Sequence, residues 1–286
     1  MDQKYKLLHD ETISYLGRTL YRIVALKDFG DVKSGDKGGY VDFGDVKSGD
    51  KGGYVVSENN LSQEGNAWIF DKAKVLDGYA RVYGNARVYQ EAQIFDDAQV
   101  FGEARVYGTA VIRDHARVCG HARIGDNALI CSSASISNRA AVLERAQVGG
   151  SAQVLGEAVV SGCALVGGGA RLWGRVAIIG DARVGGNVCI GDNVIVMGNA
   201  LIKSNADYIV FKNWWSSGCF FIWTKSNDMW NVGCFYGTGK ELIKKAYKDS
   251  KESGQEYERV VNYVEQIKRE KNRTKFIEYV KKLLRL

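Results

Sequence analysis

An alternation of small and aliphatic residues recurs every six residues along the middle of the chain. The small position, almost always alanine, occurs 22 times at intervals of six, from Ala80 to Ala206. An aliphatic residue stands two places after each small one up to Ala200, from Val82 to Ile202. This in-out-in pattern with β-branched residues predicts one short strand per unit, and it excludes a helix, whose apolar period is about 3.6.

Glycine and asparagine separate the predicted strands, in runs such as YGN, GDN, GGN and MGN. These residues accept the turn conformations that other residues resist. Each unit is therefore one strand and one corner. Such units can only bury their apolar face by stacking turn on turn, with neighbouring strands about 4.8 Å apart. We expect a mainly β protein built around a prism of stacked coils.

Three segments resemble the hexapeptide repeat of left-handed parallel β-helices: IGDNALI (124–130), VGGNVCI (184–190) and IGDNVIV (190–196). The resemblance implies three units per coil, a left-handed coil and about seven coils in all. It also implies association into trimers along the sides of the prism. Proteins with this repeat include acyltransferases, so the resemblance makes acyl transfer one function to test.

A second resemblance lies before the regular repeats. ALKDFGDVKSGDKGGYV, together with NNLSQEGNAWIFDKAKV (59–75), is similar to the N-terminal segment of the YdcK type of hexapeptide protein. That group is often labelled acyltransferase-like, so the resemblance names a family and not a reaction.

The sequence divides into three regions at residues 66 and 206. Residues 1–66 form a mixed N-terminal cap, with a strand expected at 20–26. Residues 67–206 form the β-helix, with a one-residue insertion near Gly78. Residues 207–286 form an α+β domain with a β-hairpin and two to three helices.

The N-terminal cap contains an exact tandem duplication. DFGDVKSGDKGGYV occurs at 28–41 and again at 42–55. Because fourteen is not a multiple of six, the extra copy adds no prism units. We expect one copy to be extruded as a loop.

Residues 207–286 are rich in tryptophan and in turn signals. The run CFFIWTKSNDMWNVGCFYG reads as two strands around an SND turn. Two helices follow, and each is predicted to open with a capping box, Thr238 with Glu241 and Ser253 with Glu256. Apolar residues at helical spacing in the second helix predict that it packs against another element.

Composition narrows the function classes. The N-terminus shows no signal-peptide pattern and no stretch approaches a membrane span, so we expect a cytoplasmic protein without membrane contact. Six cysteines without ligand spacing argue against a metal site and against a disulfide framework. The net charge of +6 equals that of residues 268–286 alone. This basic tail is either a solvated amphipathic helix, the favoured interpretation, or a site for nucleic acid.

Histidine is scarce, which limits the candidates for a general base. His115 and His121 occupy the corner position of consecutive units, so they stand on different edges of the prism, about 20 Å apart. They cannot meet within one chain. As an acyltransferase the protein would need one of them as base at a subunit boundary, with acetyl-CoA or acyl-CoA as the donor.

Aromatic residues point outward on the first coils. At eighteen residues per coil, Tyr83 should stack on Phe101 and Tyr89 on Tyr107. The five residues predicted to form an oligomer interface are Tyr83, Tyr89, Phe95, Phe101 and Tyr107. Coverage by the N-terminal region of the same chain is the alternative.

These observations favour a non-catalytic, self-associating scaffold that binds a partner or a small ligand through its terminal domains, without a cofactor. The repeat runs without an inserted loop, whereas enzymes of this fold typically build their acceptor site on one. The predicted binding surface is the C-terminal aromatic group Trp214, Trp215, Trp223, Trp230 and Tyr236. A small domain core is the alternative interpretation of that group.

Overall fold

The computed structural model describes residues 3–30, 45–213 and 218–284. The chain divides into two compact units, Met1–Asp207 and Tyr208–Leu286. The first contains all the repeats, and the second contains the tryptophan-rich region.

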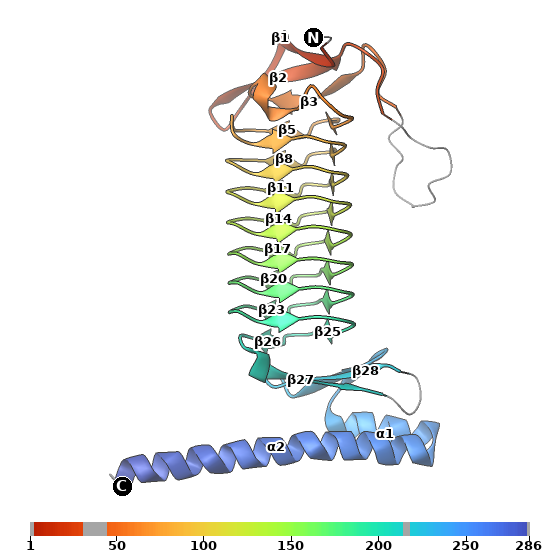
Figure 1. Ribbon diagram of the computed structural model, residues 1–286, viewed down its shortest axis with the longest axis vertical. Coiled ribbons are helices and arrows are strands. Elements are labelled where there is room, and N and C mark those ends of the chain that lie inside the picture. Colours follow the sequence, from red (N-terminus) through yellow and green to blue (C-terminus); the bar gives the residue numbers. More distant parts are fainter. Residues whose placement is uncertain (1–2, 31–44, 214–217, 285–286) are drawn as a thin grey trace. The chain divides into compact units, whose positions relative to one another are not determined.

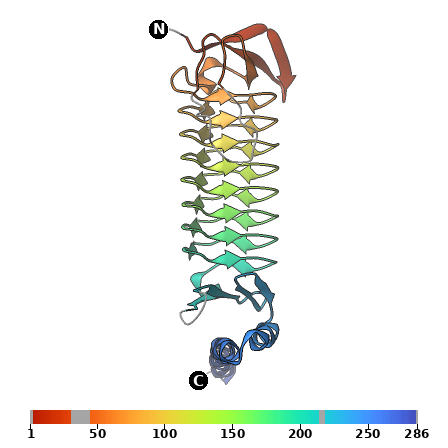
Figure 2. The ribbon, with the colours of Figure 1, turned by 90° about the vertical axis from the view of Figure 1, so that its right-hand side faces the viewer.

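Unit 1 is a parallel β-solenoid with three faces built from two-residue strands (Figures 1 and 2). The first face contains β5 (Lys74–Val75), β8 (Gln93–Ile94), β11 (Val111–Ile112), β14 (Leu129–Ile130), β17 (Gln147–Val148), β20 (Leu165–Val166), β23 (Arg183–Val184) and β26 (Leu201–Ile202). The second face contains β4 (Trp68–Ile69), β7 (Arg87–Val88), β10 (Arg105–Val106), β13 (Arg123–Ile124), β16 (Ala141–Val142), β19 (Val159–Val160), β22 (Ala177–Ile178) and β25 (Ile195–Val196). The third face contains β6 (Arg81–Val82), β9 (Gln99–Val100), β12 (Arg117–Val118), β15 (Ser135–Ile136), β18 (Gln153–Val154), β21 (Arg171–Leu172) and β24 (Cys189–Ile190).

The predicted parallel solenoid is confirmed, with about eight coils. Two strands, β4 and β5, precede the strict repeat, which accounts for the additional coil. Strand β6 begins seven residues after the start of β5, whereas each later strand up to β26 begins six residues after the previous one. This confirms the predicted insertion near Gly78. Ala206 lies in the 3-10 helix η2 (Asn205–Asp207) and not in a further unit. The left hand of the coil stays a prediction.

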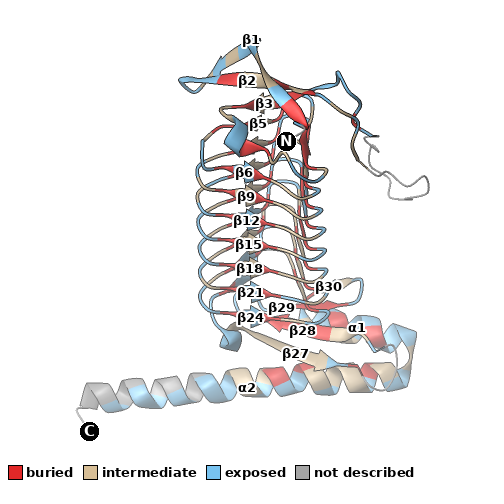
Figure 3. Ribbon diagram, turned by 45° about the horizontal axis from the view of Figure 1, so that its top comes forward, coloured by how far each residue is buried: buried red, intermediate tan, exposed pale blue. Residues whose placement is uncertain are grey.

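The interior of the solenoid consists of the two buried positions of each repeat. Alanine and the aliphatic residue two places later are buried in coil after coil, and Figure 3 shows these strand positions in red. Neighbouring coils stack in register, as where Val82 pairs with Val100. Each buried aliphatic side chain contributes about 1.5–3 kcal/mol. The repeat therefore builds its own core without help from a second layer.

An antiparallel cap precedes the coils. Strand β1 (Tyr5–Tyr15) pairs with β2 (Arg18–Ala25), which confirms the strand expected at 20–26, and β2 pairs with β3 (Lys51–Val55). Strand β3 then pairs in parallel with β5, so the sheet changes from antiparallel to parallel at β3. A 3-10 turn, η1 (Glu58–Asn60), leads into the coils. The cap thus covers the open strand edge of the first face.

The described residues of the duplication are 28–30 from the first copy and 45–55 from the second. Together they make up the sequence of one copy. Phe29 of the first copy and Val46 of the second form an antiparallel bridge, with N–H···O distances of 2.9 and 3.0 Å. A Cβ placed on Gly30 would lie 3.7 Å from the Asp45 Cα. The backbones of Gly30 and Asp45 therefore lie almost as close together as those of consecutive residues. The predicted extruded loop falls on residues 31–44, which lie outside the described residues.

Deleting residues 31–44 leaves a chain with a single copy of the duplicated sequence. We expect unit 1 to fold unchanged, because the residues on both sides of the deletion already meet. The free energy of unfolding should change by less than about 2 kcal/mol, the scale of closing a fourteen-residue loop. Thermal unfolding followed by circular dichroism measures this. Loss of the β-sheet signal in the deletion variant would show that both copies are needed.

One lysine is buried in the cap. The Lys4 side chain is 1% exposed, and its Nζ donates to the backbone oxygens of Gly65 at 3.2 Å and Ala67 at 3.0 Å. The ammonium also lies 5.2 Å from the Phe29 ring centroid. Burial, helped by the nearby charge of Lys27, lowers the pKa of Lys4 from 10.5 to about 8.

This lowered pKa predicts a pH-dependent stability of the cap. Between pH 8 and 10.5 the unfolded chain binds more protons at Lys4 than the folded chain, so stability rises with pH across this window. The rise is at most about 3 kcal/mol, because the carbonyl acceptors favour the charged form. Denaturant unfolding at several pH values measures it, and Lys4→Met should remove the slope. An unchanged slope in that variant would rule out Lys4 as its source.

Unit 2 is a four-stranded antiparallel sheet followed by two helices. Its strands are β27 (Tyr208–Lys212), β28 (Phe220–Thr224), β29 (Met229–Val232) and β30 (Phe235–Gly237), and its helices are α1 (Gly239–Asp249) and α2 (Lys251–Leu284). The predicted hairpin is β28 and β29. None of the helices, over the residues described, combines the length and apolar character needed to cross a membrane.

One of the two predicted capping boxes is confirmed and the other is wrong. Thr238 and Glu241 form one at the start of α1, as expected. The box predicted at Ser253 is wrong, because α2 begins at Lys251 and the Ser253 N–H donates to Ser250 Oγ at 3.0 Å. Helix α2 includes most of the basic tail, whose role toward nucleic acid stays a prediction.

Candidate functional site

The outward aromatic residues form two stacks on the first coils. The rings of Tyr83 and Phe101 lie 4.8 Å apart with planes 2° from parallel, and those of Tyr89 and Tyr107 lie 5.4 Å apart at 13°. Both stacks follow from the register of strands on neighbouring coils. The predicted stacking is confirmed. Phe95 lies half-buried on the first face, away from both stacks.

The chain itself covers one end of each stack. The Arg117 guanidinium lies over Phe101 at 5.4 Å from the ring centroid. The Tyr107 ring lies over Gly125, where an added Cβ would come within 2.2 Å of it. Burial, with a contribution from Tyr107, raises the pKa of Tyr89 to about 12, against the opposing charges of nearby arginines. A role of these aromatic residues in an oligomer interface stays a prediction.

A pocket of about 480 Å³ opens beside the Tyr83–Phe101 stack, where the cap meets the third face. The third face has one strand fewer than the other two, and Leu61 replaces the missing strand with a single parallel bridge to Val82. The Ser62 N–H donates to the Val82 carbonyl at 3.0 Å. The missing strand leaves this hollow, which we name the junction pocket. Its lining residues are Glu58, Asn59, Leu61, Ser62, Gln63, Arg81, Val82, Tyr83 and Gln99.

The junction pocket combines several kinds of polar group with one aromatic ring. Glu58 offers a carboxylate, Arg81 a guanidinium, and Gln63 and Gln99 offer carboxamides. The Tyr83 hydroxyl is 3.3 Å from Gln99 Oε1. Pockets of about 300–1,000 Å³ with a few convergent polar groups hold small molecules. The lining therefore suits a small, polar, hydrogen-bonding ligand.

The two candidate histidines lie on separate edges of the solenoid. His115 Nε2 is 3.2 Å from Asp97 Oδ2, and His121 Nδ1 is 3.5 Å from Glu103 Oε2. Each partner stands eighteen residues earlier, at the same corner of the preceding coil. Both histidines are exposed. The structure thus pairs each histidine with a carboxylate and does not bring the two together.

Two of the five predicted binding aromatics lie in the core of unit 2. Trp223 is 4% exposed and Trp230 is 1% exposed, whereas Tyr236 is 37% exposed. Trp214 and Trp215 lie outside the described residues. The core around the two buried tryptophans includes Phe221, Val232, Leu242, Val261 and Val264. The binding role of the five aromatics stays a prediction.

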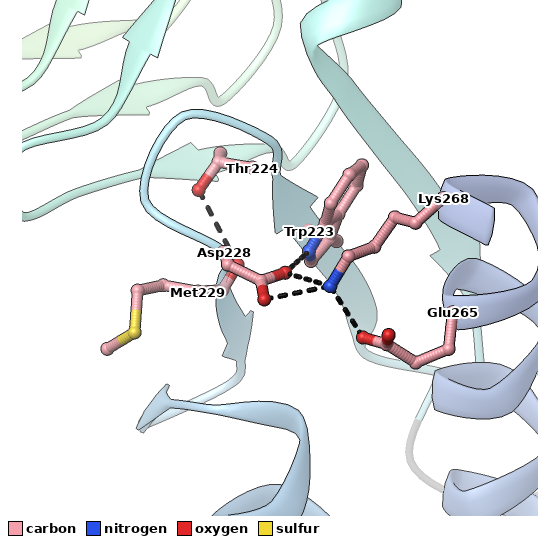
Figure 4. Close-up of polar contacts among 6 residues, drawn as sticks. All are labelled: Trp223, Thr224, Asp228, Met229, Glu265 and Lys268. Carbon is pink, nitrogen blue, oxygen red and sulfur yellow. Dashed lines mark hydrogen bonds and ion pairs between the residues drawn. The ribbon is translucent and has the colours of Figure 1, made fainter. Parts of the chain in front are cut away.

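The polar end of Trp223 takes part in an ion-pair network (Figure 4). Trp223 Nε1 donates to Asp228 Oδ1 at 2.8 Å, and Lys268 Nζ donates to both Asp228 oxygens at 2.8 Å and to Glu265 at 2.7 Å. Burial alone would lower the pKa of Lys268, but its hydrogen bonds and the two carboxylate charges raise it above its usual value. This network ties the β28–β29 turn to α2.

Comparison with known families supports the assignment of the repeat as a β-solenoid repeat. Residues 80–96 match the family profile described as the YdcK Beta solenoid repeat. The solenoid is YdcK-like. No curated protein matches the sequence significantly. The matched residues of the YdcK-like solenoid include Tyr83 of the junction pocket and Tyr89 of the second aromatic stack.

Sequence reasoning missed the junction pocket. Its residues come from the cap and from two coils, and the segment 59–63, although part of the YdcK-like stretch, carries no pattern that indicates a pocket. The available signal was the point at which the strict repeat begins, because a face that starts one strand late leaves a gap beside the cap.

Proposed function

We propose that this YdcK-like solenoid protein is a non-catalytic, self-associating scaffold whose terminal regions recognise a partner or a small ligand. The observation that carries the proposal is the junction pocket, which lies at the N-terminal end of the coils and is lined by polar groups and an aromatic ring. The ligand that suits it is small and polar, because its lining offers charged, amide and hydroxyl groups around one ring face.

The outward positions of the second face support self-association. On four successive coils, β16 to β25, this face has no charged residue. Its half-buried outward residues are Leu143, Val159, Ser161, Ala177, Ile179, Ile195 and Met197, while Ala141 is buried. An uncharged sheet surface suits packing against another copy of the chain. We propose a homo-oligomer, with a trimer favoured.

Native mass spectrometry tests the proposed ligand site. Protein purified from its host is expected to retain a small molecule that the Arg81→Ser variant loses. Arg171→Ser is the matched control, because Arg171 occupies the same repeat position on the same face, away from the pocket. Equal retention by native protein and Arg81→Ser would place the ligand elsewhere.

The second candidate function is acyl transfer from acetyl-CoA or acyl-CoA at a subunit boundary. The pairing of His121 with Glu103, and of His115 with Asp97, supports it because a carboxylate can orient a histidine that acts as general base. A double variant, His115→Ala with His121→Ala, tests this directly. Full activity of that variant in the host would eliminate the acyltransferase.

A further inference from the structure

Three arginines gather at the edge that leads from the third face to the second. A hollow of about 260 Å³ lies there, lined by Glu103, Arg105, His121, Arg123 and Arg139. All five belong to unit 1. We name this hollow the arginine pocket, and it is distinct from the junction pocket, with which it shares no residue.

The repeat builds the arginine pocket by using the same two positions on successive coils. Glu103, His121 and Arg139 occupy one corner position, each eighteen residues after the last. Arg105 and Arg123 occupy the outward strand position two residues later, and their Cα atoms are register partners on β10 and β13. On the next coil Ala141 is the register partner of Arg123, so the side chains become short there. On the preceding coil Arg87 is the register partner of Arg105, so the row of strand arginines runs from Arg87 to Arg123 and ends at Ala141.

The charges around the arginine pocket are not balanced within the described residues. Arg105 and Arg123 are adjacent like charges, about 4.8 Å apart at the backbone, and neither makes an ion pair with a described residue. Glu103 pairs with His121. Arg139 lies 3.9 Å from Glu157, which is closer to Arg175 at 3.0 Å. Adjacent like charges on paired strands destabilise a sheet unless an anion lies between them.

We propose that the arginine pocket binds a phosphate dianion, either free or as the phosphate of a small phosphomonoester. Guanidinium groups bind tetrahedral oxyanions through paired N–H donors, and the register of β10 and β13 places Arg105 and Arg123 side by side on neighbouring coils. The lining of the arginine pocket contains three guanidinium groups and one carboxylate, which leaves an excess of positive charge. A phosphomonoester carries close to two negative charges at pH 7. The hollow is smaller than the usual range of about 300–1,000 Å³ for organic ligands, which favours a small anion.

Isothermal titration with orthophosphate and with phenyl phosphate, in buffer with about 0.1 M chloride, tests the proposal. The native protein is expected to bind with a dissociation constant on the order of 1 mM or tighter. Arg105→Gln and Arg123→Gln should each weaken binding about tenfold or more. Arg171→Gln, an exposed arginine at the same repeat position on another face, should bind as the native protein does.

Thermal unfolding separates loss of the ligand from loss of the fold. Without phosphate, Arg123→Gln should be at least as stable as the native protein, because one of two adjacent like charges is removed. With phosphate, the melting temperature of the native protein should rise while that of Arg123→Gln should not.

The two probes distinguish the sources of phosphate. Tighter binding of phenyl phosphate indicates a phosphomonoester, and equal or tighter binding of orthophosphate indicates the free ion. No binding by the native protein, or equal weakening by Arg171→Gln, would overturn the proposal. So would much tighter binding of a single-stranded oligonucleotide that has a steep salt dependence and is weakened by Arg123→Gln, because the arginine pocket would then serve nucleic acid.

Discussion

Replacing Gly53 by valine in a chain that lacks residues 31–44 is expected to detach the cap from the first coil. A Cβ at Gly53 would lie 2.5 Å from the Ala73 carbonyl oxygen and 2.6 Å from Ile69 Cγ2. The backbone of β3 therefore has no room for a side chain where antiparallel cap and parallel coils meet. Overpacking against fixed backbone should lower the free energy of unfolding of the cap by more than about 3 kcal/mol.

The deletion background matters because residues 37–41 repeat the sequence of β3. A chain with both copies holds a second KGGYV segment, so the effect of one substitution would be ambiguous. Hydrogen exchange of the β1 to β3 amides measures the detachment. Gly78→Ala is the control, since a Cβ there meets no atom within 4 Å. Native-like protection of the cap in the Gly53→Val chain would contradict the described joint between β3 and β5.

Replacing Trp230 by alanine is expected to unfold unit 2 while unit 1 keeps its structure. Trp230 is 1% exposed and lies in the core with Phe221 and Val264. Removing a buried tryptophan costs about 3–5 kcal/mol, which is much of the stability of a domain this small. The two units pack around separate cores, so the solenoid should be unaffected. Hydrogen exchange resolved by region measures both responses.

Tyr236→Ala is the matched control for that experiment. Tyr236 is 37% exposed, and its hydroxyl accepts a hydrogen bond from Asn227 Nδ2 at 3.2 Å. Its loss should cost less than about 1.5 kcal/mol. If Trp230→Ala instead leaves unit 2 folded, the core role of Trp230 would be contradicted.

The repeat made most of the fold predictable from sequence. A period of six with alanine and valine at fixed positions specifies strand, corner and buried face together, so the strands from Arg81 to Ile202 follow directly. The stacking of Tyr83 on Phe101 needed only the length of one coil. Such predictions succeed because every contact of this kind is made between equivalent positions of neighbouring repeats.

Features outside the repeat were harder to predict. Strand β1 pairs with β2 through a register shift between Leu8 and Thr12, which leaves no simple alternation in sequence. Ser250 caps the second helix although Ser253 has the better motif, because α1 ends at Asp249 and α2 begins two residues later. The pockets depend on side chains brought together from different coils.

Native mass spectrometry of the protein purified from its host tests the central claim most directly, because it reports the number of subunits and any retained molecule together. The account predicts an oligomer, with a trimer favoured, that carries a small polar ligand or a protein partner. A monomer without any bound molecule would contradict it. So would a trimer with a CoA-sized adduct, which would favour the acyltransferase and direct attention to His115 and His121.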